Sequence, residues 1–299
     1  MTINVKDGGT FREVNQVYVH DGTSFTNKTI TNAYVKDGGV WREIFTLFNT
    51  TAFSQTTGSV TVPTNANAFH IQFATGGGSG GVGGAEYDKA GGESAGAGGA
   101  SGAFISDKVF TVTSGETLTI NVGGAGSGVG GGYNVTAGNG GDTTITSSSS
   151  GINITLQGGI GGNGNSGGVQ GPLRNNVAST GGTASIAGTV LTSGTSVDGL
   201  NITSFTSGPV GTFNQSGNGT AGVNPGNCGG DNCQIAGGNG GASYGNPGSS
   251  DFAGGSGAPA GGSGTAGNRG SGGGGGGAQP QTGGSNGGAG EIQYRFLRI

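Results

Sequence analysis

The segment A-F-H-I-Q-F-A-T-G-G-G-S-G-G, residues 68–81, joins an alternating stretch directly to a run of glycine. Phe69, Ile71 and Phe73 alternate with polar residues, a pattern that is typical of a β-strand with one buried face. The stretch runs straight into the glycines that begin at Gly76. The sequence therefore predicts a strand that continues as an extended glycine tract.

Similar stretches recur on both sides of this segment. They are rich in Val, Ile, Thr and Phe at alternating positions, which favours strands. No stretch of about ten residues lacks helix breakers and shows a helical period, so we expect essentially no α-helix and an all-β fold. The predicted strands cover residues 51–55, 58–63, 68–74, 103–112, 116–124, 142–146, 152–156 and 291–299.

Glycine dominates the composition. The chain has 77 Gly and 7 Pro among 299 residues, a share that without a period normally indicates low complexity. Disordered chains, however, usually carry a high net charge, whereas this chain has a net charge of −4. The glycines instead gather in tracts between the predicted strands, at residues 76–84, 91–103, 123–132, 158–168, 237–248 and 254–290.

These tracts do not match two familiar glycine-rich structures. Collagen needs glycine at every third position and abundant proline, and calcium-binding β-roll repeats need an Asp in each turn. Packed polyglycine-II helices fit better, because extended helices with about three residues per turn can pair their backbone groups laterally. Only small residues then fit inside a tract, such as Ala90, Ser94, Ala95 and Ala97. Flexible loops are the alternative, and amide exchange distinguishes the two.

The N-terminal residues contain a repeat, in V-K-D-G-G-T-F-R-E-V (5–14), V-H-D-G-T-S-F-T-N-K (19–28) and V-K-D-G-G-V-W-R-E-I (35–44). Asp-Gly between strand-like residues predicts a hairpin, here with turns at Asp7-Gly8, Asp21-Gly22 and Asp37-Gly38. A piece this small buries too little surface to be stable alone. We therefore expect residues 1–48 to be an attachment or oligomerisation module and residues 49–299 to be the glycine-rich domain. The attachment candidates are Phe11, Arg12, Phe25, Trp41 and Arg42, with the three aromatic residues on one face; an ordinary β-meander is the alternative.

Several segments resemble the glycine-rich domain of phage tail proteins. They are S-V-T-V-P (59–63) before F-H-I-Q-F (69–73), L-T-I-N-V-G-G-A-G (118–126), and the glycines of 272–277 before the last strand. The pattern is similar to that of the tail-fibre tip adhesins of T-even phages. This resemblance implies a β-sandwich with packed polyglycine-II helices and loops that contact a receptor. The D-G-G-x-W-R-E-I repeat at 37–44 is similar to short repeats of marine phage structural proteins.

Receptor contacts would then lie in the segments that interrupt the tracts, because binding residues are often found on loops of a rigid scaffold. Aromatic rings stack on sugars or protein patches, and Asn, Asp and Arg add polar contacts, a composition shared with antibody loops. An ordinary solvated turn is the alternative at each position. The candidates are Tyr87, Tyr133, Arg174, Asn175, Phe213, Asn214, Asp231, Asn232, Tyr244 and Phe252.

Other partners and chemistries are not expected. The chain lacks the basic run that nucleic acid requires, the apolar span of about 20 residues that a membrane requires, and a signal-peptide pattern in residues 1–9. Neither a cofactor nor a metal is predicted, since Cys228 and Cys233 alone do not complete a zinc site. Those two cysteines form either a local disulfide or free thiols. His20 and His70 lie in strand-like contexts, where half-buried histidines are expected rather than catalytic ones.

Together with these exclusions, the resemblance to phage tail proteins implies a non-enzymatic virion protein at a tail-fibre tip, made in the host cytoplasm, that binds a protein or glycan receptor on the bacterial surface. It would contact other tail or fibre proteins and form a homo-oligomer, for which a trimer is one candidate. A structural virion protein of the fibre, neck or connector is the main alternative. A glycine-rich ice-binding protein fits less well, because the aromatic inserts are irregular. A glycan-cleaving enzyme would need paired carboxylates from scattered loop acids.

Overall fold

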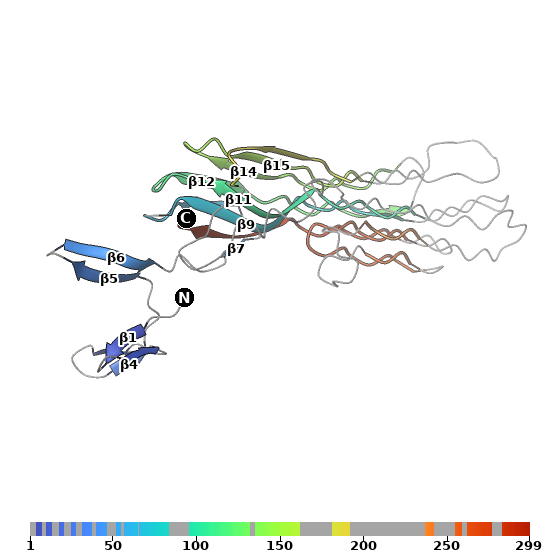
Figure 1. Cartoon of the computed structure of the whole chain (residues 1–299). Coiled ribbons are helices and arrows are strands. Elements are labelled where there is room, and N and C mark those ends of the chain that lie inside the picture. Colours follow the sequence, from blue (N-terminus) through green and yellow to red (C-terminus); the bar gives the residue numbers. More distant parts are fainter. Residues whose placement is uncertain are drawn as a thin grey trace, which may run out of the picture.

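A computed structural model describes residues 57–64, 66–83, 96–131, 135–161, 181–191, 237–241, 255–258, 262–276 and 283–299, and the backbone of strands between residues 4 and 54. No helix occurs among these residues. The described fold is all-β, as predicted. It combines short hairpins, a two-layered β-sandwich and a bundle of glycine tracts (Figure 1).

The sandwich consists of two antiparallel sheets. One has the strand order β11-β9-β17-β7 and the other the order β16-β15-β14-β12-β8. The strands of the first sheet are β7 (Ala52–Ser54), β9 (Ala68–Thr75), β11 (Phe104–Thr111) and β17 (Glu291–Leu297). Those of the second are β8 (Gly58–Thr61), β12 (Thr117–Asn121), β14 (Thr143–Ser147), β15 (Asn153–Leu156) and β16 (Ala184–Ala187).

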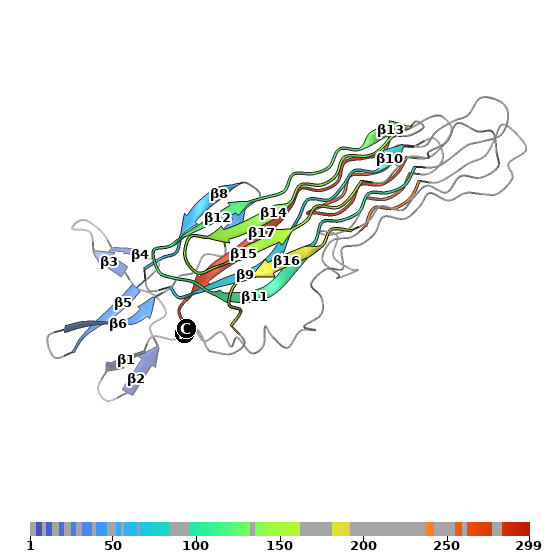
Figure 2. The ribbon, with the colours of Figure 1, turned by 90° about the horizontal axis from the view of Figure 1, so that it is seen from above.

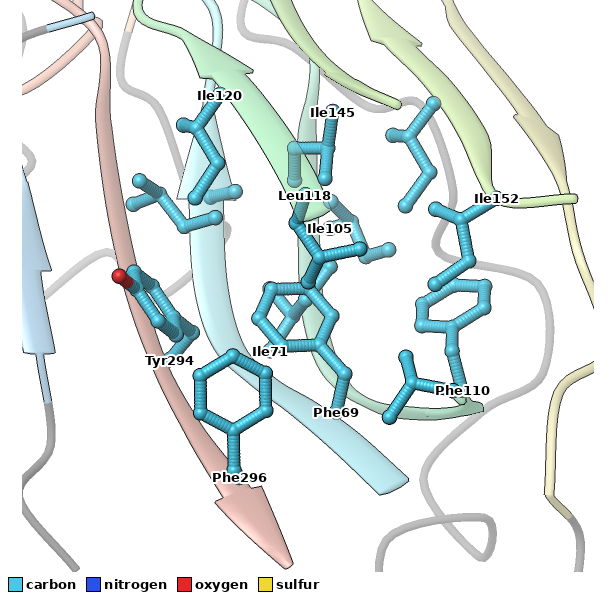
Figure 3. Packing of buried hydrophobic residues seen from close by; sticks show 14 of the residues in the cluster. Phe69, Ile71, Ile105, Phe110, Leu118, Ile120, Ile145, Ile152, Tyr294 and Phe296 are labelled. Atoms are coloured by element: carbon cyan, nitrogen blue, oxygen red, sulfur yellow. The ribbon is translucent and has the colours of Figure 1, made fainter. Parts of the chain in front are cut away.

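An apolar core fills the space between the two sheets (Figure 3). Phe69 lies at its centre, with ring centroids 5.2 Å from Tyr294 and 5.5 Å from Phe296, distances that favour aromatic pairing. Ile145 and Ile154 are buried on the facing sheet. Strand β9 contributes Phe69, Ile71 and Ala74 to this core, whereas Phe73 is buried outside it, because the pairing of β9 with β17 shifts register between Gln293 and Tyr294. Burial raises the pKa of the Tyr294 hydroxyl.

The predicted strands are confirmed in place, each within a few residues of its observed bounds. Strand β16 was not predicted, because A-S-I-A offers one large apolar residue and two alanines. It pairs with β15 at the edge of the sheet, so its extended backbone follows from its neighbour rather than from local propensity.

Three N-terminal hairpins are also confirmed, each as a separate two-stranded sheet. Asp7 pairs with Thr10 and Asp37 pairs with Val40, so two glycines connect these strands and the predicted Asp-Gly turns are displaced by one residue. Two glycines suit the positive φ angles that such tight turns need. The strands are β1 (Asn4–Asp7), β2 (Thr10–Glu13), β3 (Tyr18–His20), β4 (Phe25–Asn27), β5 (Asn32–Asp37) and β6 (Val40–Thr46).

Beyond the sandwich the chain continues as parallel and antiparallel glycine-rich tracts (Figure 2). Seven of them directly precede or follow a sandwich strand. Strands β10 (Val82–Gly83) and β13 (Val129–Gly131) form a short parallel pair within them. The tracts are named A (76–83), B (96–103), C (122–131), D (135–142), E (157–161), F (181–183), G (237–241), H (255–258), I (262–268), J (271–276) and K (283–290).

The hydrogen bonds of tract A repeat every three residues. Gly76, Ser79 and Val82 each donate their N–H to a carbonyl oxygen of tract B. The next position in each turn donates to tract D, and the third position donates to tract K. Tract A also accepts hydrogen bonds from tracts C, E and J, which gives it three acceptor and three donor neighbours. This three-residue period is that of a polyglycine-II helix, and it confirms the predicted packing in the described tracts.

The tracts approach too closely for side chains. A Cβ atom on Gly77 would lie 2.0 Å from the carbonyl oxygen of Gly124, and one on Gly78 would lie 1.9 Å from that of Ser271. Of the small residues predicted to fit inside the tracts, Ala97 is fully buried, and Ala90, Ser94 and Ala95 lie outside the described part of the chain. Buried Ser79 adds hydrogen bonds, since its Oγ accepts from the Ala100 N–H at 2.7 Å.

Glycine also lets the two layers of the sandwich merge. Tract A continues β9 of one sheet, and tract D leads into β14 of the other. Gly77 nevertheless donates directly to the Gly141 carbonyl at 2.9 Å, whereas packed sheets with side chains are about 10 Å apart. Where the core side chains end, the two sheets therefore become one backbone lattice.

The predicted tract 254–290 is not one continuous rod. Its described residues form tracts H, I, J and K, which run in alternating directions. A turn at Arg269 (φ 34°) and Gly270 (φ 74°) joins tracts I and J. Arg269 Nε lies 3.5 Å from Oε2 of Glu291, whose side chain is fully buried at the start of β17. This ion pair fixes the junction between the bundle and the sandwich.

At the opposite pole of the sandwich, Glu116 joins two turns. Its Oε1 accepts from the Thr113 N–H at 2.7 Å, and its Oε2 accepts from the N–H groups of Ser149 at 3.1 Å and Ser150 at 2.9 Å. Burial alone would raise the pKa of Glu116, but these hydrogen bonds outweigh it and hold the pKa below the ordinary value of 4.5.

Replacing Gly77 by alanine should destabilise the protein strongly, because its Cβ would overlap the Gly124 backbone. We expect a loss of about 3 kcal/mol, or roughly 6–12 °C in the thermal midpoint. Gly124→Ala is the matched control, since nothing lies within 4 Å of its Cβ position. Equal midpoints for the two variants would contradict the packing.

Amide hydrogen exchange should show strong protection in tract A. Each N–H from Gly76 to Val82 donates to a neighbouring tract, so we expect exchange at least about a thousandfold slower than in an unstructured peptide. Mass spectrometry of peptides covering residues 76–82 measures this directly. Exchange at the rate of a free peptide would instead support flexible glycine loops.

The Glu116→Gln variant should lose stability at neutral pH, by about 1–3 kcal/mol, because an amide cannot accept all three backbone hydrogen bonds. The folded-state pKa of Glu116 is lowered, so the contribution of the carboxylate is complete above the unfolded pKa and is lost as the pH falls through the folded pKa. The difference in thermal midpoint between wild type and variant should therefore shrink below about pH 4.5. A constant difference down to pH 2 would contradict this.

Candidate functional site

Several described tracts end on the side of the bundle that lies away from the sandwich, where β10 and β13 are found (Figure 2). Tracts A, C, E, H and J run away from the sandwich, and tracts B, D, F, G, I and K run back towards it. The reversals from A to B, C to D, H to I and J to K therefore belong to this end. The segments between these tracts are residues 84–95, 132–134, 259–261 and 277–282.

Backbone hydrogen bonds hold the tract ends together in one layer. The Val82 N–H donates to the Ala97 carbonyl at 2.9 Å, and the Gly276 N–H donates to the Val82 carbonyl at 3.0 Å. Gly96 donates in turn to the Gly276 carbonyl at 2.9 Å, which closes a ring between tracts A, B and J. Val129 joins this layer by pairing with Val82. We call these five residues the end layer.

The end layer is closely packed and lacks ionisable and aromatic side chains. A Cβ atom on Gly96 would lie 1.7 Å from the Val82 carbonyl oxygen, so the two backbones are in direct contact. Its residues are Gly, Ala and Val, and they carry no ionisable or aromatic group. The end layer therefore fixes where the chain leaves and re-enters the bundle, and it offers no charged or aromatic side chain of its own.

Two of the receptor candidates belong to segments that start and end at this layer. Tyr87 falls in 84–95, between Gly83 and Gly96, and Tyr133 falls in 132–134, directly after Gly131. Both residues lie outside the described part of the chain, as do the other eight candidates. Their contacts thus remain predictions, but the topology brings the flanks of these two segments together.

The segments that contain four of the remaining candidates have flanks away from the end layer. Segment 162–180, with Arg174 and Asn175, starts after tract E and ends at tract F, where Gly182 donates to Ser101 near the sandwich. Segment 242–254, with Tyr244 and Phe252, starts and ends on the sandwich side of the bundle, because Gly255 donates to Gly272 close to the turn at Gly270.

Segment 192–236 contains Phe213, Asn214, Asp231 and Asn232 and both cysteines. Its first flank, Leu191, donates to Val109 in the sandwich, whereas its second flank, Gly237, donates to Ala258 at the far end of the bundle. The segment therefore connects the two ends of the glycine-rich domain. The pairing of Cys228 and Cys233 lies outside the described residues.

The attachment candidates lie in the N-terminal hairpins. Phe11 and Arg12 belong to β2, Phe25 to β4, and Trp41 and Arg42 to β6. Their side chains are outside the described part of the structure, so the predicted shared aromatic face stays a prediction.

His70 provides a charged cluster away from the end layer. It lies in strand β9, as expected, but it is only 1% exposed rather than half-buried. Its Nδ1 accepts from Arg295 Nε at 3.0 Å, and its Nε2 lies 3.6 Å from Asp107 Oδ1. The three residues come from adjacent strands of one sheet, which makes the cluster a cross-strand polar contact.

Two further findings concern the described residues alone. They contain no group of three or more His, Cys, Asp or Glu side chains arranged to hold a metal ion. No described segment forms a helix that could cross a lipid bilayer.

Comparison with protein families matches residues 51–297 to a family described as a glycine-rich domain. No curated protein matches the chain. The match includes the sandwich and the bundle and begins after the N-terminal hairpins. Since it spans most of the 299 residues, the chain belongs to the glycine-rich domain family.

Proposed function

We propose that this chain is a virion adhesin, located at the tip of a phage tail fibre, that binds a receptor on the surface of the host bacterium. The observation that carries the proposal is the end layer, where several chain reversals start and end on one hydrogen-bonded surface. Loops on a rigid support are a common basis for recognition.

The bundle suits this role because it fixes the loop ends before binding. Each tract is held by neighbours on several sides, so the loops lose less conformational freedom on binding than loops on a mobile support would. Segment 84–95 supplies Tyr87 between charged residues, and segment 132–134 supplies Tyr133 beside Asn134. This chemistry suits a glycan or a protein surface.

The opposite pole of the sandwich suits attachment to the virion. Strand β7 is antiparallel to β17, and β17 leads away from tract K, so the chain enters the sandwich from the side opposite the bundle. The N-terminal hairpins, which precede β7, are therefore the proposed contact with other tail proteins or with copies of the chain. The resemblance to phage tail proteins supports the same arrangement, in which the protein acts by binding and not as an enzyme.

Binding to cells tests the proposal. Fluorescently labelled protein should bind saturably to a narrow set of bacterial strains, and the parent phage should compete. The double variant Tyr87→Ala, Tyr133→Ala should bind at least about tenfold more weakly, because aromatic residues dominate binding energy. The control Thr146→Ala, Asn153→Ala changes two exposed residues on the outer face of the sandwich and should bind like wild type.

Two outcomes would contradict the proposal. If wild-type protein binds no strain that the phage infects, the structural role in a fibre, neck or connector becomes the better account. If the tyrosine variant binds as well as the control, a receptor site at the end layer is excluded.

A further inference from the structure

Three asparagines in the bundle share a sequence context. Asn139, Asn239 and Asn286 are each followed by two glycines, and each is exposed on the surface of its tract. They lie in tracts D, G and K, which are separate in the sequence and run back towards the sandwich. The recurrence of N-G-G points to a common role.

Each asparagine makes the same two-point contact with a neighbouring tract. Asn139 Oδ1 accepts from the Gly161 N–H at 2.8 Å, and the next residue, Gly140, donates to the Gly159 carbonyl at 2.9 Å. The Asn139 side chain and the Gly140 N–H thus bond to the N–H of Gly161 and the carbonyl of Gly159, which are two residues apart in tract E.

The other two asparagines repeat this geometry. Asn239 accepts from Gly257 at 2.7 Å and Asn286 accepts from Gly128 at 2.8 Å. The following glycines complete the contact, because Gly240 donates to the Gly255 carbonyl and Gly287 donates to the Gly126 carbonyl. Each carbonyl lies two residues before the donor to the asparagine in the same tract. Three edge tracts, C, E and H, therefore receive one such contact each.

The side chain takes the place of a missing tract. Inside the bundle, the N–H groups of tract A point in three directions, and each donates to the backbone carbonyl of an adjacent tract. At Gly128, Gly161 and Gly257 the acceptor is instead a side-chain amide. An asparagine amide presents the same carbonyl group as a peptide bond, so it completes the hydrogen bonding where the lattice stops.

An open lattice edge resembles the open edge of a β-sheet, which recruits further strands unless it is protected. The most available source of a matching glycine tract is another molecule of the same sequence. We propose that Asn139, Asn239 and Asn286 close the edges of the bundle against the glycine tracts of a second copy of this chain. This role is independent of receptor binding.

Light scattering after size-exclusion chromatography of the full chain tests the proposal. The triple variant Asn139→Ala, Asn239→Ala, Asn286→Ala adds no atoms to the bundle and removes the three acceptors. We expect its mass to be at least twice that of wild type and to rise with concentration. A triple control, Thr146→Ala, Asn153→Ala, Ser185→Ala, should keep the wild-type mass.

The triple Asn→Asp variant retains the acceptors and should also keep the wild-type mass, measured in about 1 M salt so that added charge is screened. Slow hydrogen exchange of the tract A amides shows whether the triple alanine variant is folded. A folded triple alanine variant with the wild-type mass would overturn the proposal. If that variant loses the protection, each single alanine variant is measured instead, and wild-type mass for all three would overturn it. Association of the aspartate variant would overturn it as well.

Discussion

The lateral hydrogen bond between two glycine tracts is the interaction on which the rest of the bundle depends. At most contacts it requires glycine: a Cβ atom on Gly77 would lie 2.0 Å from the Gly124 carbonyl oxygen. Small or slender side chains occur at a few contacts, such as that of Val82 with Ala97. Ordering glycine costs more conformational entropy than ordering any other residue. That cost is offset because a tract such as A bonds to neighbours in every direction, with each residue donating to one of them.

The sandwich makes such a lattice possible by setting where tracts begin. Its apolar core fixes the strands, and seven tracts continue directly from strand ends. The tract residues next to the strands are thus already adjacent to one another where the side chains of the core end. The ion pair between Arg269 and Glu291 secures the later tracts, which do not all adjoin a strand. Core and lattice therefore depend on each other: the core sets the order of the tracts, and the lattice replaces the core where no side chains remain.

Local patterns predicted the positions of the strands well, because alternating apolar residues are typical of strands. They did not predict that β9 would be buried on both faces. They also predicted the three-residue helices, because the tracts lack both the strict glycine period of collagen and the regular Asp of β-rolls. Flexible loops were the alternative that the sequence left open. Local patterns did not predict β16, where Ala184 and Ala187 carry little apolar signal, or the division of 254–290 into several tracts. Most tract residues are glycines, which have no side chain to specify a neighbouring tract, so tract order depends mainly on connections far apart in the sequence. The asparagine contacts were missed for the same reason, although the repeated N-G-G was visible; the receptor candidates lie outside the described residues.

The direction of the tracts also has a mechanical consequence. The tracts lie along the line that joins the end layer to the sandwich, and their hydrogen bonds lie across it (Figure 2). A pull applied at the end layer and resisted at the sandwich would load these bonds in shear, so that many must break together. Pulling one tract sideways would break its hydrogen bonds one after another, at a lower force. The bundle is consequently strongest along its own axis, and the proposed attachment of a cell at the end layer would load it in that direction.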